Sequence, residues 1–80
     1  MKIEGSYTRK RDSVTCTYTA KTGRAPGGTV TWDARVYVDD RFVGTPGGQL
    51  LASMVSLADL EQLIRSMVER SIEDNISIQI

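Results

Sequence analysis

The chain has no histidine and a single cysteine, Cys16, among its 80 residues. Without histidine it lacks the side chain that most readily titrates near neutral pH, and both Ser-His-Asp and Cys-His catalysis are excluded. One cysteine without histidine also leaves too few ligands for a structural zinc site. An intrachain disulfide is impossible, which fits a reducing compartment. We therefore expect a cytoplasmic, non-enzymatic protein with no cofactor, no metal and no catalytic residue.

Long apolar runs are also absent from the sequence. No stretch approaches the length of a membrane span, and Met1–Gly5 does not resemble the apolar region of a signal peptide. The hydrophobic content of 40% and the charged content of 25% are ordinary for a globular domain. Eighty residues predict one domain over residues 1–80, which is too small to line a deep and closed active site. We expect no membrane association.

The net charge is zero, but the two ends of the chain carry opposite charge. Residues 1–28 contain six basic and two acidic side chains, which gives +4. Residues 56–80 contain two basic and five acidic side chains, which gives −3. This asymmetry is compatible with self-association, with an anionic partner, or with neither.

The candidates for contact with nucleic acid or another anion are the cations of the basic N-terminal region, Arg9, Lys10, Arg11, Lys21 and Arg24. Cations bind phosphate, and tyrosines on a sheet, here Tyr7, Tyr18 and Tyr37, can stack on bases. The whole chain is neutral, however, and it shows no RNA-recognition, KH or helix-turn-helix signature. A solvated charged face is therefore the favoured interpretation of these cations.

An amphipathic helix is predicted from residue 57 to residue 72. Apolar side chains recur there at spacings of three and four, at Leu57, Leu60, Leu63, Ile64, Met67, Val68 and Ile72. Ser56 followed by Asp59 is typical of a helix start, in which the serine accepts backbone N–H groups. The helix should end near Asp74, because Asn75 can adopt the left-handed cap conformation.

Two strands, each with one apolar face, are predicted before this helix. In Ser13–Ala20 threonines alternate with apolar residues, and Thr29–Val38 also alternates. Between them Thr22–Gly28 contains a Pro-Gly pair that suits a type II turn, and we expect a hairpin with a loose loop. Residues 39–40, both aspartate, form the next predicted turn, and a short strand follows over Arg41–Gly44.

Other stretches are less clearly patterned. A second Pro-Gly-Gly, over residues 46–48, is predicted to end the short strand, and residues 49–55 are ambiguous between strand and helix, with the strand favoured. Three isoleucines alternating through residues 76–80 predict a terminal strand. Near the N-terminus residues 9–12 predict a turn or an arm, and whether residues 1–12 are ordered is left open.

These elements predict an α+β fold, a small two-layer domain in which an antiparallel sheet of about 3–5 strands packs against one long amphipathic C-terminal helix. Trp32 should pack beneath this helix against Leu60 and Ile64. Cys16 shares a strand face with apolar residues, which predicts a core residue rather than a reactive thiol. Neither Pro-Gly-Gly segment is followed by Gly-Lys-Ser/Thr, so we interpret both as turns and not as phosphate loops.

The segment Trp32–Gly44, followed by Leu60–Arg65, resembles short uncharacterised bacterial proteins of strand–strand–helix build. The resemblance covers residues 30–72 and implies both this fold and a bacterial origin. It carries over no activity and no functional residue.

Three hypotheses for the function follow from the sequence. The leading one is a small interaction module that binds another protein or itself, because exposed sheet edges invite pairing with another chain. Weak nucleic-acid binding through the basic N-terminal region is the alternative. A carboxylate- and metal-dependent enzyme that uses Asp33, Asp39 or Asp40 is the least favoured, because aspartate is common in turns for local reasons.

Overall fold

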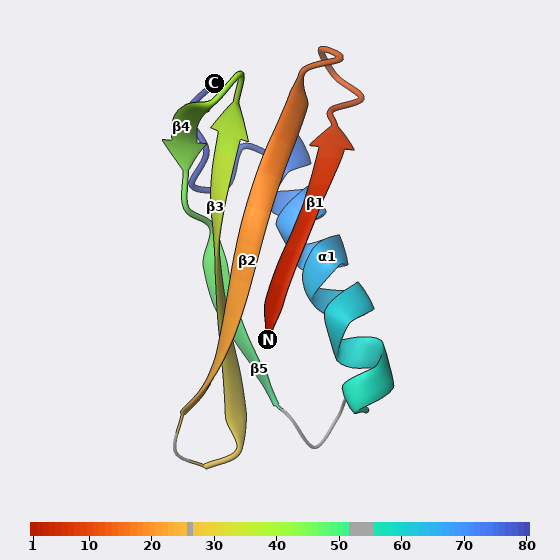
Figure 1. Cartoon of the computed structure of the whole chain (residues 1–80), viewed down its shortest axis with the longest axis vertical. Helices are drawn as coiled ribbons and strands as arrows, with labels where there is room; N and C mark the ends of the chain where they lie inside the picture. The colour runs from red at the N-terminus through yellow and green to blue at the C-terminus, as the bar shows by residue number, and fades with distance from the viewer. Residues whose placement is uncertain (26, 52–55) are drawn as a thin grey trace.

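A computed structural model of the chain describes residues 1–25, 27–51 and 56–80. The elements are β1 Lys2–Thr8, β2 Thr15–Ala25, β3 Thr29–Val38, β4 Arg41–Gly44, β5 Gly47–Leu51 and α1 Leu57–Glu73 (Figure 1). All strand pairs are antiparallel, and the sheet packs against the single C-terminal helix of the described chain. The predicted α+β fold is confirmed.

The sheet is organised around β3. One edge of β3 pairs with β2, which in turn pairs with β1. The other edge is shared, because β5 pairs with residues 29–33 and β4 pairs with residues 36–38 (Figure 1). β4 and β5 therefore act as one edge strand interrupted at residues 45–46, where the Pro46 carbonyl accepts the Ala34 N–H at 2.9 Å.

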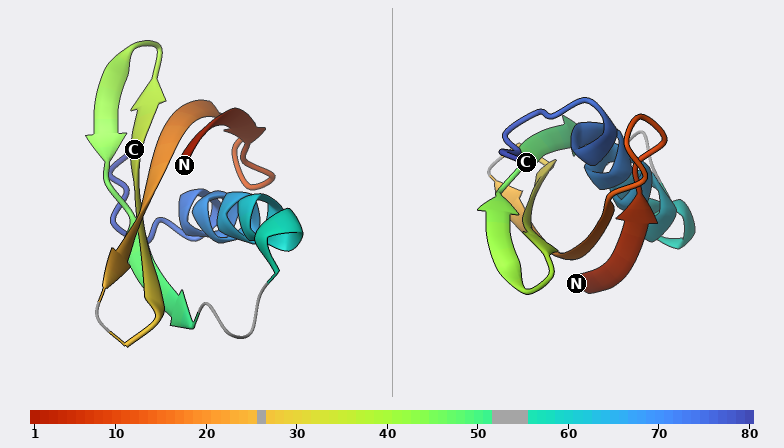
Figure 2. Two further views of the ribbon diagram at one scale, coloured as in Figure 1. Left: turned by 60° about the horizontal axis from the view of Figure 1, so that its bottom comes forward. Right: turned by 90° about the horizontal axis from the view of Figure 1, so that it is seen from above.

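The sheet is strongly curved, and α1 lies on its concave side (Figure 2). The helix approaches β1 and β2 most closely. Alternate strand residues face the helix and are buried with its apolar stripe. The buried core consists of Ile3, Cys16, Tyr18, Ala20, Val30, Trp32, Ala34, Val36, Val43, Leu60, Ile64, Val68, Ile72 and Ile78. Trp32 thus belongs to one core with Leu60 and Ile64, and Cys16 is a core residue as predicted.

A tight turn joins β3 to β4. Asp39 and Asp40 both adopt positive φ, 50° and 65°, between the paired residues Val38 and Arg41. Positive φ at both central residues defines a type I′ turn, whose twist matches the twist of the flanking strands. Aspartate tolerates this conformation better than most residues that carry a side chain. The predicted turn is therefore confirmed.

The predicted hairpin of β2 and β3 is confirmed, but the predicted loop Thr22–Gly28 is too long. β2 continues to Ala25, which is paired with Thr29, and residue 26 of the predicted loop lies outside the described residues. Gly27 at φ 85° and Gly28 at φ 77° supply the left-handed conformations that glycine adopts freely. Pairing with β3 outweighs the weak strand propensity at the end of β2, because strand formation depends on the neighbouring strand.

The second Pro-Gly-Gly segment does not form the predicted turn, because Gly47 and Gly48 lie inside β5. A Cβ atom added at Gly48 would lie 2.9 Å from Trp32 Nε1, and one added at Gly47 would lie 3.0 Å from the Trp32 carbonyl oxygen. The two glycines thus allow β5 to pack closely against Trp32. β5 extends to Leu51, as the favoured strand alternative predicted, and residues 52–55 of that ambiguous stretch lie outside the described residues.

Both predicted ends of α1 are confirmed. The Ser56 hydroxyl accepts the Asp59 N–H at 3.3 Å and donates to the Asp59 carboxylate at 2.8 Å. An N-cap of this kind stabilises a helix by about 1 kcal/mol, and the acid faces the positive end of the helix dipole. At the other end Asp74 is the C-cap, and Asn75 adopts φ 56°.

The residues after α1 do not form the predicted terminal strand. Positive φ at Asn75 and Ser77 breaks the alternation of the three isoleucines, and Ile78 alone among them is buried. Ile78 forms a single bridge with Gly44 of β4. Because Gly44 has no side chain, the Ser77 carbonyl and Ile78 lie directly against it. This tail, residues 75–80, therefore covers the outer edge of β4 (Figure 1).

Replacing Gly48 with alanine tests the packing of β5 against Trp32. The new methyl group would meet a ring that is 5% exposed and held in the core, so we expect the free energy of unfolding to fall by about 1–3 kcal/mol. Gly23→Ala is the matched control, because its nearest neighbour is the Thr31 hydroxyl at 3.2 Å, and we expect a change within about 0.5 kcal/mol. Urea unfolding followed by circular dichroism measures both, and equal losses would contradict this role of Gly48.

Candidate functional site

The five cations predicted from the sequence do not form one surface. Residues 9–11 lie in the turn between β1 and β2, whereas Lys21 and Arg24 lie in the second half of β2. A strand rises about 3.3 Å per residue, so Lys21 lies roughly 20 Å along β2 from its first residue, Thr15. Lys21 and Arg24 are also an odd number of positions apart and project from opposite faces of the sheet.

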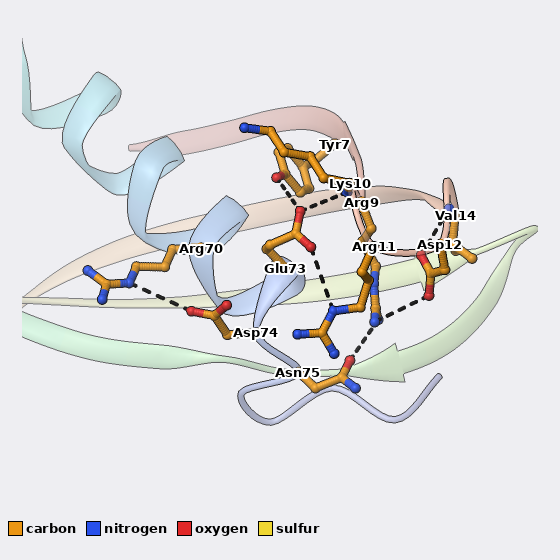
Figure 3. A network of polar contacts seen from close by, with 10 residues as sticks. All are labelled: Tyr7, Arg9, Lys10, Arg11, Asp12, Val14, Arg70, Glu73, Asp74 and Asn75. Atoms are coloured by element: carbon orange, nitrogen blue, oxygen red, sulfur yellow. Dashed lines mark hydrogen bonds and ion pairs between the residues drawn. The ribbon is translucent and has the colours of Figure 1, made fainter.

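Arg9 is buried, with 3% of its surface exposed. Its guanidinium donates from Nη1 to Asn75 Oδ1 at 2.6 Å, and its Nη2 lies 3.3 Å from Asp12 Oδ2 (Figure 3). The Arg9 N–H donates to the Val14 carbonyl at 2.8 Å. Residues 9–12 therefore adopt the turn alternative rather than the arm, and this side chain holds the turn against the end of α1.

Glu73, the last residue of α1, ties the same turn to the helix (Figure 3). Glu73 Oε1 accepts the Tyr7 hydroxyl at 2.7 Å and the Lys10 N–H at 2.8 Å. Glu73 Oε2 lies 3.7 Å from Arg11 Nε. The hydrogen bond from the Lys10 N–H, followed by that from the Tyr7 hydroxyl, lowers the pKa of Glu73. We call Tyr7, Lys10, Arg11 and Glu73 the Glu73 clamp.

The Glu73 clamp brings the basic and acidic ends of the sequence together within one chain. Glu73 is 66 positions from Tyr7 and 63 positions from Lys10, so no local pattern predicts these contacts. Arg11, one of the predicted anion-binding cations, already faces a carboxylate of its own chain. Part of the charge asymmetry that suggested self-association is therefore neutralised inside the molecule.

A second polar network covers the outer edge of β1. Gly5 is paired with Tyr18, and its missing side chain leaves room for the Tyr18 ring. The Tyr18 hydroxyl donates to Glu69 Oε2 at 2.9 Å, and burial is the main cause that raises the pKa of Tyr18. Arg65 Nη1 donates at 2.8 Å to the Glu4 carbonyl, which the antiparallel register turns away from β2. Arg65 thus occupies one position at which another strand could pair.

The candidate functional site is an aromatic pair, exposed Phe42 and half-buried Tyr37, on the sheet face opposite α1. Phe42 of β4 is 53% exposed, and its ring meets the Tyr37 ring of β3 edge to face, with centroids 5.7 Å apart and an interplanar angle of 67°. Arg35 and Thr45 complete a depression of about 470 Å³ at these rings. We call Arg35, Tyr37, Phe42 and Thr45 the Phe42 surface.

A second depression, of about 500 Å³, adjoins the first between β4 and the tail. Its lining consists of Phe42, Val43, Gly44, Thr45, Asn75, Ser77, Ile78 and Gln79. Phe42 and Thr45 line both depressions, so the Phe42 ring is accessible from each of them. Both depressions are open to solvent, which suits the docking of side chains from a partner rather than the enclosure of a small substrate.

The two-residue turn sets the Phe42 surface. Its register pairs Val38 with Arg41 and Tyr37 with Phe42, and the next residue, Val43, faces the core and is buried. The shift in the pairing of β3 with β4 lies beyond this pair, between Val36 and Tyr37. Sequence reasoning missed this site, because it predicted the short strand without assigning a face to Phe42. The one signal was that Tyr37 alternates with the apolar residues of β3, which places an aromatic ring on the polar face of that strand.

The remaining sequence candidates occupy ordinary structural positions. Cys16 is fully buried, and burial is the main cause that raises the pKa of its thiol. Asp39 and Asp40 belong to the exposed type I′ turn. Within the ranges that the structure describes, no three His, Cys, Asp or Glu side chains are grouped as metal ligands would be.

Glu73→Gln tests the Glu73 clamp through the pH dependence of stability. Because the clamp lowers the pKa of Glu73 below its ordinary value of 4.5, the ionised carboxylate stabilises the fold above that value. This contribution is lost as the pH falls through 4.5 towards the lowered pKa. We expect the variant to be less stable at neutral pH, and to lose less stability than the wild type between about pH 5 and pH 3.

Urea unfolding at a series of pH values measures this effect. Ser66→Ala is the control, because it lies on an exposed part of the same helix and changes no charge. It should keep the pH dependence of the wild type. An unchanged pH dependence in Glu73→Gln would show that the clamp does not act through the charge of its carboxylate.

Within the described ranges of the chain, no helix is both long and apolar enough to cross a membrane. Comparison with protein-family models, curated proteins and solved structures finds no match to this chain. The Phe42 surface is therefore the feature from which we infer a function.

Proposed function

We propose that this protein is a non-enzymatic module that binds another protein chain through the Phe42 surface. The observation that carries the proposal is the exposed Phe42 ring, which is set against Tyr37 and bordered by Arg35. Aromatic residues and arginine are the types that most often anchor protein–protein interfaces. When a partner removes an exposed apolar ring from water, the free energy of the complex falls, so such a ring favours binding.

The fold holds the Phe42 surface in place before any partner binds. The type I′ turn fixes β4 against β3 on one side. On the other side the tail follows β4, where the Gln79 N–H donates to the Val43 carbonyl at 2.7 Å. Binding costs less conformational entropy when the anchoring ring is already positioned. The surrounding backbone thus supports a role for Phe42 in recognition.

Self-association through the outer edges of β1 and β4 or through opposite charges has less support. Arg65 occupies the Glu4 carbonyl at the outer edge of β1, and the tail covers the outer edge of β4. The opposite charges of the chain ends meet within the Glu73 clamp. A partner that docks on the side chains of the Phe42 surface requires neither an open edge nor a net charge.

Photo-crosslinking from position 42 tests the proposal. Benzoylphenylalanine replaces Phe42 in one variant and replaces Gln62, an exposed residue of α1, in the matched control. After irradiation in extracts of the cells that make the protein, we expect a discrete protein adduct from position 42 and none from position 62. An excess of unlabelled wild-type protein should compete for the adduct, whereas the Phe42→Ser variant should not.

The outcomes of this experiment are distinct. An adduct that requires position 42 and the wild-type surface supports the proposal, whether the captured chain is a different protein or a second copy. Equal adducts from both positions contradict it. A nuclease-sensitive adduct also contradicts it and favours the nucleic-acid alternative, for which the exposed cations are Lys10, Arg11, Lys21 and Arg24.

A further inference from the structure

We infer that the segment bound at the Phe42 surface is acidic and apolar, with an Asp or Glu side chain beside an aliphatic or aromatic one. This inference rests on the proposed function and names the partner's chemistry. In such a complex the apolar side chain packs against Phe42 and Tyr37, and the carboxylate accepts hydrogen bonds from the Arg35 guanidinium.

Arg35 is the charge that selects the partner. Its side chain is exposed, and no carboxylate of the described residues lies within 4.0 Å of it. The arginines that do have such a partner within the chain are Arg9, Arg11, Arg65 and Arg70. Arg35 therefore differs from the arginines that stabilise the fold, because its charge is not matched by a carboxylate of its own chain.

The described lining of the two depressions offers no acidic group that a basic partner could use. Among these described residues, Arg35 is the one charged side chain. A basic segment would meet this charge without compensation, and like charges placed together disfavour binding. An acidic segment meets a complementary charge, so charge complementarity selects the acidic partner.

A lone guanidinium also favours a carboxylate over a phosphate group. The planar fork of arginine forms bidentate contacts with carboxylate and with phosphate, so the other groups of the site decide between the two. Proteins that bind phosphopeptides typically use clusters of arginines, and many phosphate sites add the N-terminus of a helix. The described lining of the Phe42 surface contains neither feature.

Peptide selection by phage display on the purified protein tests this inference. Random peptides of about 12 residues, long enough to cover a surface groove, are depleted on Phe42→Ser and then selected on the wild type. We expect the enriched peptides to place Asp or Glu beside Leu, Ile, Phe or Trp. Circular dichroism of each variant establishes that it is folded.

Affinity measurements with the enriched peptides separate the role of Arg35 from that of Phe42. We expect Arg35→Ala to weaken binding about tenfold or more, as the loss of a charge-assisted hydrogen bond predicts. Arg24→Ala is the matched control, because Arg24 is also exposed and without a described carboxylate within 4.0 Å, yet it lies outside the Phe42 surface. Its removal should change the affinity less than about twofold.

Each outcome decides at least one of the two proposals. Acidic peptides that depend on both Phe42 and Arg35 support the inference. Peptides that depend on Phe42 but lack an acid, or that bind Arg35→Ala as tightly as the wild type, overturn the inference and leave the proposed function intact. The absence of any peptide that depends on Phe42 overturns both.

Discussion

Beside the apolar core, the carboxylate of Glu73 joins the end of the helix to the N-terminal hairpin. By accepting hydrogen bonds from Tyr7 and Lys10, it anchors the last turn of α1 to the turn that follows β1. The tail begins directly after this anchor and runs along β4, where Ile78 meets Gly44. The edge of the sheet that carries Phe42 is thus stabilised by a segment whose starting point is fixed by contacts with the N-terminal hairpin.

Much of the fold can be predicted from the sequence because the responsible signals are local. The helix needs only its own apolar spacing together with Ser56 and Asn75, since caps and periodicity act within a few residues. The predicted bounds of the central strand, Thr29–Val38, agree with β3, because alternation over ten residues leaves one face for the core. The turn at Asp39 and Asp40 is also a local signal, because aspartate favours turns wherever it occurs in the sequence.

The long-range contacts of the fold and the candidate site cannot be predicted in this way, because their parts meet only after folding. Arg9 has the appearance of a surface cation, and its burial depends on Asn75, 66 positions away. Gly48 has the appearance of a turn residue until Trp32 packs against it. The exposure of Phe42 depends on which face of β4 lies against the core, and it is Val43, the next residue, that is buried there. In each case both residues can be read from the sequence, but the contact between them cannot.

β4 and β5 pair with different parts of the same edge of β3. This edge of the sheet therefore consists of two short strands, each with its own hydrogen bonds to β3. Opening one strand breaks bonds to its own part of β3, so residues 29–33 and 36–38 can exchange their amide hydrogens at different rates. A partner bound at Phe42 stabilises the hydrogen bonds between β4 and β3. It does not change the local opening of β5. Slower amide exchange confined to β4, the tail and residues 36–38 is therefore the signature that such a partner leaves on this fold.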